Sequence, residues 1–322
     1  MTGHSALLIA GPTAGGKSEL ALGLAAVLPG GGEIVCADSM QVWRGMDIGT
    51  AKPSPEERAR VPHHALDLAD PHHDAFTAAD WLRHARAAID AIRSRGRWPV
   101  VVGGTNLYLR LLMEGMTEQA GSDPVMRAAL QDRATADLRG ELERVDPATA
   151  ATLHPNDRRR TIRALEILAA TGVPASQART QWSDAAPTPG ADMRLVGLHW
   201  SAAAINARIN ARVHRMLQSG WQREVHTLMN KGPLRAQPMQ AVGYRELAEA
   251  AEGRLSLAEA TEVIKVRTRH YAKQQRTWLK KFSAAPGTLW LDAEHTPEGM
   301  WSERVVAWLL RGSRTIDSPS PT

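Results

Sequence analysis

The residues best placed to do chemistry form a glycine-rich loop near the start of the chain. The segment 11–18 reads GPTAGGKS and matches the pattern G-x-x-x-x-G-K-[ST]. Glycines let backbone N–H groups converge on phosphate oxygens, and a following helix adds its dipole. Lys17 would supply a positive charge and Ser18 a hydroxyl for Mg²⁺. We therefore expect a phosphate-binding loop made of Gly11, Pro12, Thr13, Ala14, Gly15, Gly16, Lys17 and Ser18. The loop alone does not say whether the phosphate belongs to a nucleotide.

A carboxylate follows the second strand-like run. Residues 33–37 read EIVCA, a hydrophobic run that ends at Asp38. If this strand neighbours the first one, Asp38 lies beside the phosphate loop at the carboxyl edge of the sheet. A carboxylate there can hold a metal or act as a general base. Asp38-Ser39 could equally end a strand and cap a helix, and position alone leaves both interpretations open.

Short strands alternate with helices around these two features, which predicts an α/β fold with a parallel sheet flanked by helices. The expected strands cover residues 6–10, 33–37, 99–102, 195–199 and 288–291, which would make a five-stranded sheet. Two of the expected helices cover 18–28 and 77–95.

The pattern changes after residue 116, where the chain becomes strand-free, helical and charged up to a linker rich in proline, alanine and glycine. We interpret this stretch, residues 118–190, as an all-helical insertion or lid. The core domain is then discontinuous, with residues 1–117 and 191–312. Residues 313–322 form an expected disordered tail.

Composition bounds the class of protein. The chain has 322 residues, and 43% are hydrophobic, which is enough for a sizeable core. Only 7 of its 39 basic residues are lysine, and the formal charge is +5. This arginine surplus fits a polyanionic partner, although an arginine-rich proteome gives the same bias. The single cysteine, Cys36, excludes an intramolecular disulfide framework and a cysteine-built zinc finger. No apolar run approaches 18 residues, so we expect no membrane span and a cytoplasmic protein.

Six sequence blocks occur together in a fixed order. They are GPTAGGKS (11–18), ADSMQVWRGMDIGTAKP (37–53), VVGGTNLY (101–108), HPNDRRRTIRALE (154–166), AVGYRE (241–246) and TRHYAKQQRTWL (268–279). In this order the chain resembles the tRNA dimethylallyltransferase (tRNA isopentenyltransferase) family over roughly residues 5–295. The second block is the most specific. Having one cysteine, the chain resembles the bacterial members, which lack the zinc finger of the eukaryotic ones.

The resemblance implies a P-loop NTPase-like fold and the transfer of a dimethylallyl group from dimethylallyl diphosphate to N6 of adenosine 37 in the anticodon stem-loop of tRNA. In this family the P-loop holds the leaving diphosphate instead of ATP, with Mg²⁺ at Ser18. The resemblance makes Asp38 the general base, places Thr105 beside the reaction centre, and gives Arg212 a diphosphate contact. It also implies a monomer.

The resemblance further implies a set of tRNA contacts spread over six parts of the chain. They are Asp38, Ser39, Met40, Gln41, Thr105, Asp123, Arg159, Arg160, Thr161, Ile162, Arg163, Gln240, Ala241, Val242, Gly243, Tyr244, Arg245, Thr268, Arg269, His270, Tyr271, Ala272, Lys273, Gln274 and Gln275. Gln274 stands where the family pattern has arginine.

The residues suit this reaction on chemical grounds as well. An aromatic exocyclic amine is a poor nucleophile, so a base at nitrogen and positive groups at the departing diphosphate both lower the barrier. The common alternative for prenyl diphosphates uses aspartate-rich clusters, and this chain has no Asp-Asp pair. Basic residues recur at helical spacing within 256–283, namely Lys265, Arg269, Lys273, Arg276 and Lys280, and would share one face.

Three other functions share some of these features. A P-loop small-molecule kinase, or a prenyltransferase acting on free adenine nucleotides, would explain the loop and Asp38 but not the basic insertion and C-terminal helix. A non-catalytic RNA-binding module with a degenerate P-loop is the third alternative. The intact Lys17, Ser18 and Asp38 argue against it.

Overall fold

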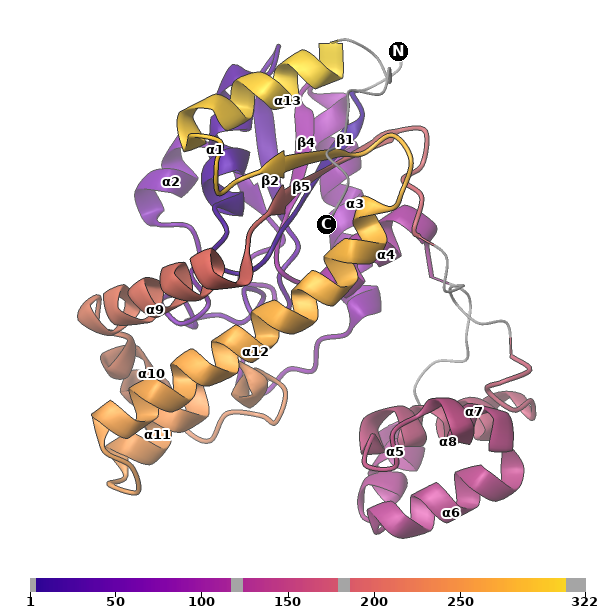
Figure 1. Cartoon of the computed structure of the whole chain (residues 1–322). Coiled ribbons are helices and arrows are strands. Elements are labelled where there is room, and N and C mark those ends of the chain that lie inside the picture. The colour runs from indigo at the N-terminus through magenta and orange to yellow at the C-terminus, as the bar shows by residue number, and fades with distance from the viewer. Residues whose placement is uncertain (1–3, 117–123, 179–185, 311–322) are drawn as a thin grey trace. The chain divides into compact units, whose positions relative to one another are not determined.

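The computed structural model describes residues 4–116, 124–178 and 186–310 (Figure 1). Contacts between Cα atoms divide the chain into two compact units. One unit comprises Met1–Glu114 with Ala186–Thr322, and the other comprises Gly115–Ala185. The expected tail at 313–322 lies outside the described residues.

A six-stranded parallel sheet forms the centre of the larger unit, in the order β3-β2-β4-β1-β5-β6. Its strands are β1 (Ala6–Ala10), β2 (Gly32–Cys36), β3 (His63–His64), β4 (Trp98–Val102), β5 (Met193–His199) and β6 (Leu289–Asp292). The register pairs Leu8 with Val101 on one side and with Leu195 on the other. All five expected strands are present within two residues of their predicted bounds. The sixth, β3, was missed because two residues show no periodicity; it pairs with β2 through Ile34 and Val35 at the sheet edge.

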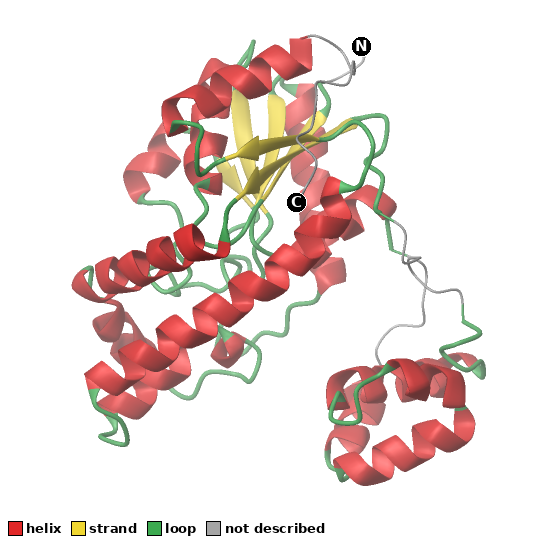
Figure 2. Cartoon of the chain, viewed as in Figure 1, coloured by secondary structure: helices red, strands yellow, loops and turns green. Residues whose placement is uncertain are grey.

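Helices lie on both sides of the sheet (Figure 2). The helices of the first half of this unit are α1 (Lys17–Val27), α2 (Pro55–Arg60), α3 (Ala78–Ser94) and α4 (Asn106–Glu114). Helix α3 begins at a capping box between Thr77 and Asp80 and buries Trp81, Ala85 and Ile89 against the sheet. Strand residues such as Ile9, Val100 and Leu198 are fully buried, so the sheet is covered on both faces.

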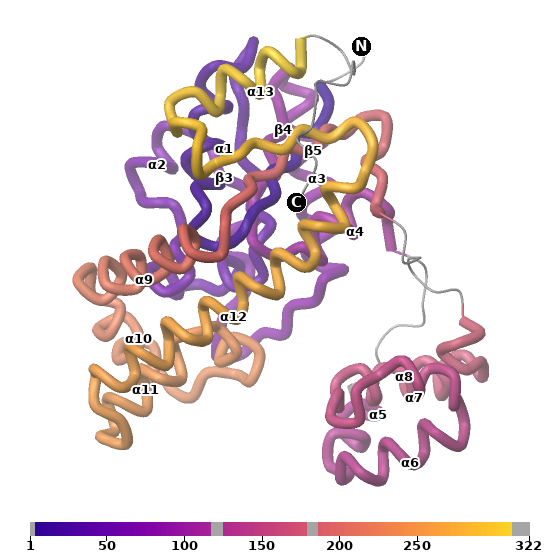
Figure 3. Tube along the Cα trace, in the orientation of Figure 1, coloured from indigo at the N-terminus to yellow at the C-terminus, as the bar shows by residue number. Residues whose placement is uncertain are grey.

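The second half of the larger unit is mostly helical. Its helices are α9 (Ala202–Gln218), α10 (Trp221–Asn230), α11 (Tyr244–Ala251), α12 (Leu257–Ser283) and α13 (Trp301–Leu310), with 3₁₀ turns at Pro238–Gln240 and Glu298–Met300. Helix α12 contacts α9, α11 and α4, and the Cα trace shows it running from α11 towards α4 (Figure 3). A capping box between Ser256 and Glu259 starts this 27-residue helix.

The smaller unit is helical throughout its described residues and has its own core. Its helices are α5 (Pro124–Gln131), α6 (Thr135–Val145), α7 (Pro147–Thr152) and α8 (Arg158–Thr171). Leu138, Leu142 and Leu165 are among the side chains that pack together in its interior. Glu166 is 3% exposed and binds Arg127 with both carboxylate oxygens, at 2.5 and 2.7 Å. A bidentate pair of this kind fixes α5 against α8.

The helices of the described residues include no candidate for a membrane span. Among the described residues, every helix is either too short or too polar to cross a bilayer.

Candidate active site

The glycine-rich loop lies between β1 and α1, where the sequence predicts it. Its carbonyl oxygens are bound by side chains: Lys17 Nζ donates to Pro12 O (2.7 Å), Arg208 Nε to Ala14 O (2.8 Å) and Trp200 Nε1 to Gly15 O (3.0 Å). The N–H groups of the first turn of α1 have no acceptor within the helix, so they remain for a bound anion. The loop therefore has the geometry of a phosphate cradle.

Lys17 lies in this loop and forms no ion pair with a carboxylate of the described residues. Its side chain is buried, and burial together with the neighbouring Arg212 lowers its pKa to about 8, although Asp38 opposes the shift. Arg212 comes from α9, is half-buried, and donates to Thr13 Oγ1 at 3.4 Å. Two cationic groups close together repel each other, and a diphosphate bound beside them would offset that repulsion.

Asp38 follows β2 and lines the same cleft as the glycine-rich loop. The cleft has a volume of about 1450 Å³. The premise that β1 and β2 are neighbours is wrong, because β4 lies between them. Asp38 reaches the cleft nonetheless, because the carboxyl ends of parallel strands share one edge and β4 ends there in two glycines. A Cβ on Gly103 would come within 2.0 Å of Ala37 O, and one on Gly104 within 3.3 Å of Asp38 Oδ2.

Hydrogen bonds fix the chain on either side of Asp38. Its Oδ1 accepts from Met40 N–H (2.9 Å), and Thr105 Oγ1 accepts from Ser39 N–H (2.9 Å). Ala37 O also accepts from Thr105 N–H (3.1 Å). Thr105 thus lies beside Asp38 and positions the turn that carries it.

Gln275 connects three parts of the site. It is 2% exposed, its Oε1 accepts from Thr13 N–H (2.7 Å), and its Nε2 donates to Gly104 O (2.8 Å). Tyr271, one turn earlier on α12, donates to the same carbonyl at 3.0 Å. Both residues were expected to contact tRNA, but the bonds of Gln275 are internal and place α12 against the P-loop.

The oxygen donors present suit a hard divalent cation. Ser18 is exposed in the first turn of α1, and Asp38 lines the same cleft. Within the described ranges, no group of three or more His, Cys, Asp and Glu side chains could hold a metal ion. Mg²⁺ commonly keeps several waters and is held by one or two protein oxygens together with substrate phosphates. The donor set therefore fits a metal that binds with a diphosphate.

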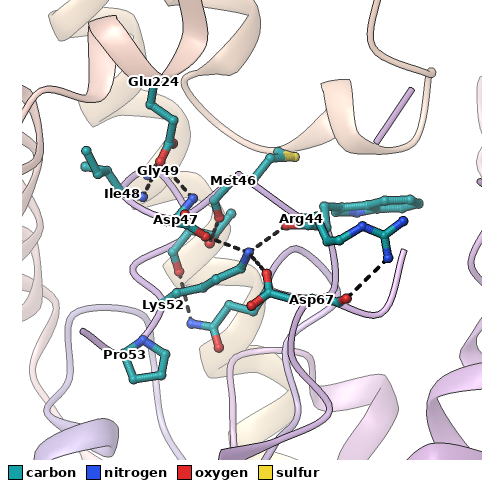
Figure 4. Close-up of polar contacts among 12 residues, drawn as sticks. Arg44, Met46, Asp47, Ile48, Gly49, Lys52, Pro53, Asp67 and Glu224 are labelled. Carbon is teal, nitrogen blue, oxygen red and sulfur yellow. Dashed lines mark hydrogen bonds and ion pairs between the residues drawn. The ribbon is translucent and has the colours of Figure 1, made fainter. Parts of the chain in front are cut away.

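Beyond Asp38, a loop connects β2 to α2, and it is held by residues that the sequence did not indicate. Glu224 of α10 accepts hydrogen bonds from the N–H groups of Asp47, Ile48 and Gly49, and Lys52 pairs with Asp47 and Asp67 (Figure 4). Although burial opposes it, bonding to Lys52 and Arg58 holds the pKa of Asp67 below its usual range. The separation of 177 residues between Asp47 and Glu224 leaves no local sequence signal for this contact.

The remaining expected tRNA contacts in the larger unit are divided between surface and interior. Side chains at least partly accessible are those of Gln240, Val242, Arg245, Thr268, Arg269, His270, Tyr271, Lys273 and Gln274. The buried ones are Ala241, Gly243, Tyr244, Ala272 and Gln275. Lys265 was expected on the basic face of α12, but it is buried and pairs with Glu262 (2.7 Å). The accessible basic face is therefore shorter than expected.

In the smaller unit, the stretch 159–163 at the start of α8 is divided in the same way. Arg159 and Arg160 are exposed, whereas Thr161 and Ile162 are buried in that unit's core. Arg163 pairs with Glu166 at 3.3 Å. Asp123 lies outside the described residues.

Comparisons with known proteins agree with one another. The family model described as IPP transferase matches residues 41–282. The chain is 44% identical to tRNA dimethylallyltransferase 1 of Trichlorobacter lovleyi, over 88% of this chain and 92% of that protein. It is 46% identical to the tRNA dimethylallyltransferase of Geobacter sulfurreducens, over 89% and 91%.

Two solved structures are similar over nearly the whole chain. One is the full-length tRNA isopentenylpyrophosphate transferase of Bacillus halodurans, with a TM-score of 0.67 and 34% identity, covering 96% of this chain and 97% of that one. The other is a eukaryotic dimethylallyltransferase acting on tRNA, with a TM-score of 0.80 and 28% identity, covering 98% and 81%.

Proposed function

Because the chain belongs to the IPP transferase family and is similar to tRNA dimethylallyltransferases over most of its length, we propose that it prenylates tRNA. The donor is dimethylallyl diphosphate and the acceptor is N6 of adenosine 37 in the anticodon stem-loop. The bond between C1 of the dimethylallyl group and the diphosphate oxygen breaks, and a bond between C1 and N6 forms. One N6 proton leaves to a base, and diphosphate is released.

The observation that carries this proposal is the position of Asp38 in the same cleft as the P-loop. A carboxylate there can accept the N6 proton as nitrogen becomes positively charged, a contribution of about 10²–10⁴-fold for a well-placed base. Its side chain is half-buried, and Oδ1 is oriented by Met40 N–H. Thr105, in the loop that follows β4, supports this orientation by accepting from Ser39 N–H.

The leaving group is held at the other side of the cleft. Residues 13–18 of the loop line the cleft and would hold the diphosphate, with Lys17 and Arg212 as the two positive groups beside it. Negative charge grows on the diphosphate as the carbon–oxygen bond breaks, and preformed cations stabilise that charge without reorganising. Ser18, with Asp38 lining the same cleft, would hold Mg²⁺, which when bound neutralises diphosphate oxygens.

The tRNA lies across exposed basic residues. On α12, Lys273 is exposed, and Arg269 is half-buried with its guanidinium donating to Asn210 Oδ1 at 3.2 Å. Arg245 is exposed at the start of α11. Arg159 and Arg160 add a second basic site on the smaller unit. Neutralising tRNA phosphates at these points compensates the cost of unstacking the target base, which is a few kcal/mol. We propose that the protein acts in this way as a monomer in the cytoplasm.

The test is incubation with dimethylallyl diphosphate, Mg²⁺ and unmodified tRNA, followed by mass analysis of the nucleosides. The expected product is N6-(dimethylallyl)adenosine at one position. Asp38→Ala should abolish transfer while tRNA affinity stays within about twofold, because only a small part of the interface changes. ATP turnover without prenylation would favour a kinase, and prenylation of free adenine nucleotides would favour the alternative acceptor.

A further inference from the structure

The loop that carries Gln41 is held in place by a carboxylate seated against backbone amides. Glu224 Oε2 accepts from the N–H groups of Asp47 (2.8 Å) and Ile48 (2.6 Å), and its Oε1 accepts from Gly49 N–H (3.1 Å). Tyr244 donates its hydroxyl to the same Oε1 at 2.7 Å. All four partners are donors, so only a group with two accepting oxygens matches them.

The packing around this turn leaves it little freedom. A Cβ on Gly49 would lie 2.1 Å from Trp221 Nε1 and 2.6 Å from the Tyr244 ring. Burial and the Glu224 carboxylate raise the pKa of Tyr244 well above its usual range, so its hydroxyl stays a donor. The turn Asp47–Gly49 therefore rests on α10 and α11 at van der Waals distance.

Lys52 holds the turn from the side opposite Glu224 (Figure 4). Its ammonium group has three acceptors, Trp43 O at 2.6 Å, Asp47 Oδ1 at 2.8 Å and Asp67 Oδ1 at 2.5 Å. The side chain is 1% exposed, so all three of its protons are used in the interior. Glu224 and Lys52 together fix the backbone between them.

The fixed backbone determines how Gln41 is oriented. Its Nε2 donates to Thr50 O (3.1 Å) and to Ala51 O (3.0 Å), the two residues that directly follow the Glu224-bound turn. Both amide protons are thereby used. Gln41 lines the cleft that contains Asp38, and its Oε1 accepts no hydrogen bond from the described residues. Toward a ligand, Gln41 is an acceptor only.

We propose that Glu224 is a positioning residue for prenyl transfer, acting through the Asp47–Gly49 turn to hold Gln41 as a hydrogen-bond acceptor. This rests on the proposed function. An exocyclic amine has two protons: Asp38 removes one, and Gln41 Oε1 accepts a hydrogen bond from the other. An acceptor at this point becomes more favourable as nitrogen gains positive charge, so its position affects the transition state more than the bound substrate.

The experiment compares Glu224→Gln with wild type by steady-state kinetics in both substrates. The amide places N–H groups against backbone donors, which loosens the turn. We expect kcat to fall by about 10- to 100-fold, the range that small displacements in an active site produce. The KM for dimethylallyl diphosphate should stay within about twofold, because none of the partners of Glu224 belongs to the P-loop. Glu252→Gln, an exposed change on the neighbouring loop, is the matched control and should leave kcat unchanged.

A double-mutant cycle with Gln41→Ala distinguishes positioning from general loosening. If Glu224 acts through Gln41, the double variant should be no slower than Gln41→Ala alone. Multiplicative losses, a parallel rise of both KM values, or an unchanged kcat in Glu224→Gln would each overturn the proposal. Should Glu224→Gln fail to fold, Glu224→Asp keeps the charge but is too short to reach all four donors, and the same pattern is expected. Absence of prenylation by the wild type would instead refute the proposed function.

Discussion

Filling the P-loop with diphosphate should change the protonation of Lys17. In the protein alone, burial and Arg212 lower the pKa of Lys17 to about 8. A bound diphosphate places negative charge beside the ammonium group and restores its pKa towards the ordinary value of about 10.4. Because the pKa is lower in the free protein than in the complex, binding takes up a proton at any pH between these two values. Affinity must therefore fall as the pH rises through that window.

The size of the effect follows from the two pKa values. At pH 9 a group with a pKa of about 8 is roughly one-tenth protonated, whereas in the complex it is almost fully protonated, so uptake is about 0.9 proton. At pH 7 the group is already about nine-tenths protonated and uptake is near 0.1. The dissociation constant should therefore be about tenfold larger at pH 9 than at pH 7.

Isothermal titration calorimetry with dimethylallyl diphosphate, without tRNA, measures this directly. Titrations in two buffers of different ionisation enthalpy give the number of protons taken up at each pH. Lys17→Arg is the control, because a guanidinium remains charged at pH 9, and its binding should be nearly independent of pH. An uptake near zero at pH 9 with unchanged affinity would refute the reasoning, since Lys17 would then be charged already in the free protein or distant from the diphosphate.

Three further changes test other parts of the site. Gln275→Leu leaves Thr13 N–H and Gly104 O without their partner, and should lower the free energy of unfolding by about 1–3 kcal/mol. Thermal or urea unfolding measures this, and an unchanged unfolding midpoint would show that these two hydrogen bonds do not stabilise the fold. Gly103→Ala introduces a Cβ within 2.0 Å of Ala37 O, so the chain after β2 must move and transfer should be lost. Gly140→Ala is the control, because Gly140 has no neighbour within 4 Å and no positive φ, and it should leave transfer near wild type. Arg159→Glu should weaken tRNA binding and reduce the slope of log affinity against log salt concentration by about one. If the variant bound tRNA as tightly as wild type at every salt concentration, Arg159 would not contact tRNA.

Periodicity and local signals were sufficient for most of the fold. The P-loop was found because its function depends on residues adjacent in the chain, between a strand and a helix. The order of the strands could not be predicted from local sequence patterns. β4 lies between β1 and β2, and no local pattern encodes that crossover. Asp38 was nevertheless chosen correctly as a cleft residue, because all carboxyl ends of a parallel sheet lie at one edge whichever strands are neighbours.

The supporting residues of the site were the part that sequence could not supply. Glu224 and Gln275 act through backbone groups more than 170 residues away, and a carboxylate or amide on a helix surface carries no mark of such a partner. Lys265 illustrates the opposite error. Its spacing predicted a place on the exposed basic face of α12. Which side chains of a helix are exposed depends on the elements that pack against it, and Lys265 is buried.

Helix α12 sets a fixed spacing between the P-loop and the proposed tRNA-binding face. Its 27 residues span about 40 Å as one uninterrupted rod, with Gln275 at the P-loop and Arg269 six positions earlier, about 9 Å along the axis. A rod of this kind has no joint at which the cationic side chains could be adjusted separately from the diphosphate pocket. One residue inserted between the two positions would rotate Arg269 by about 100° around the axis relative to Gln275. The number of residues between Arg269 and Gln275 therefore matters as much as their identity.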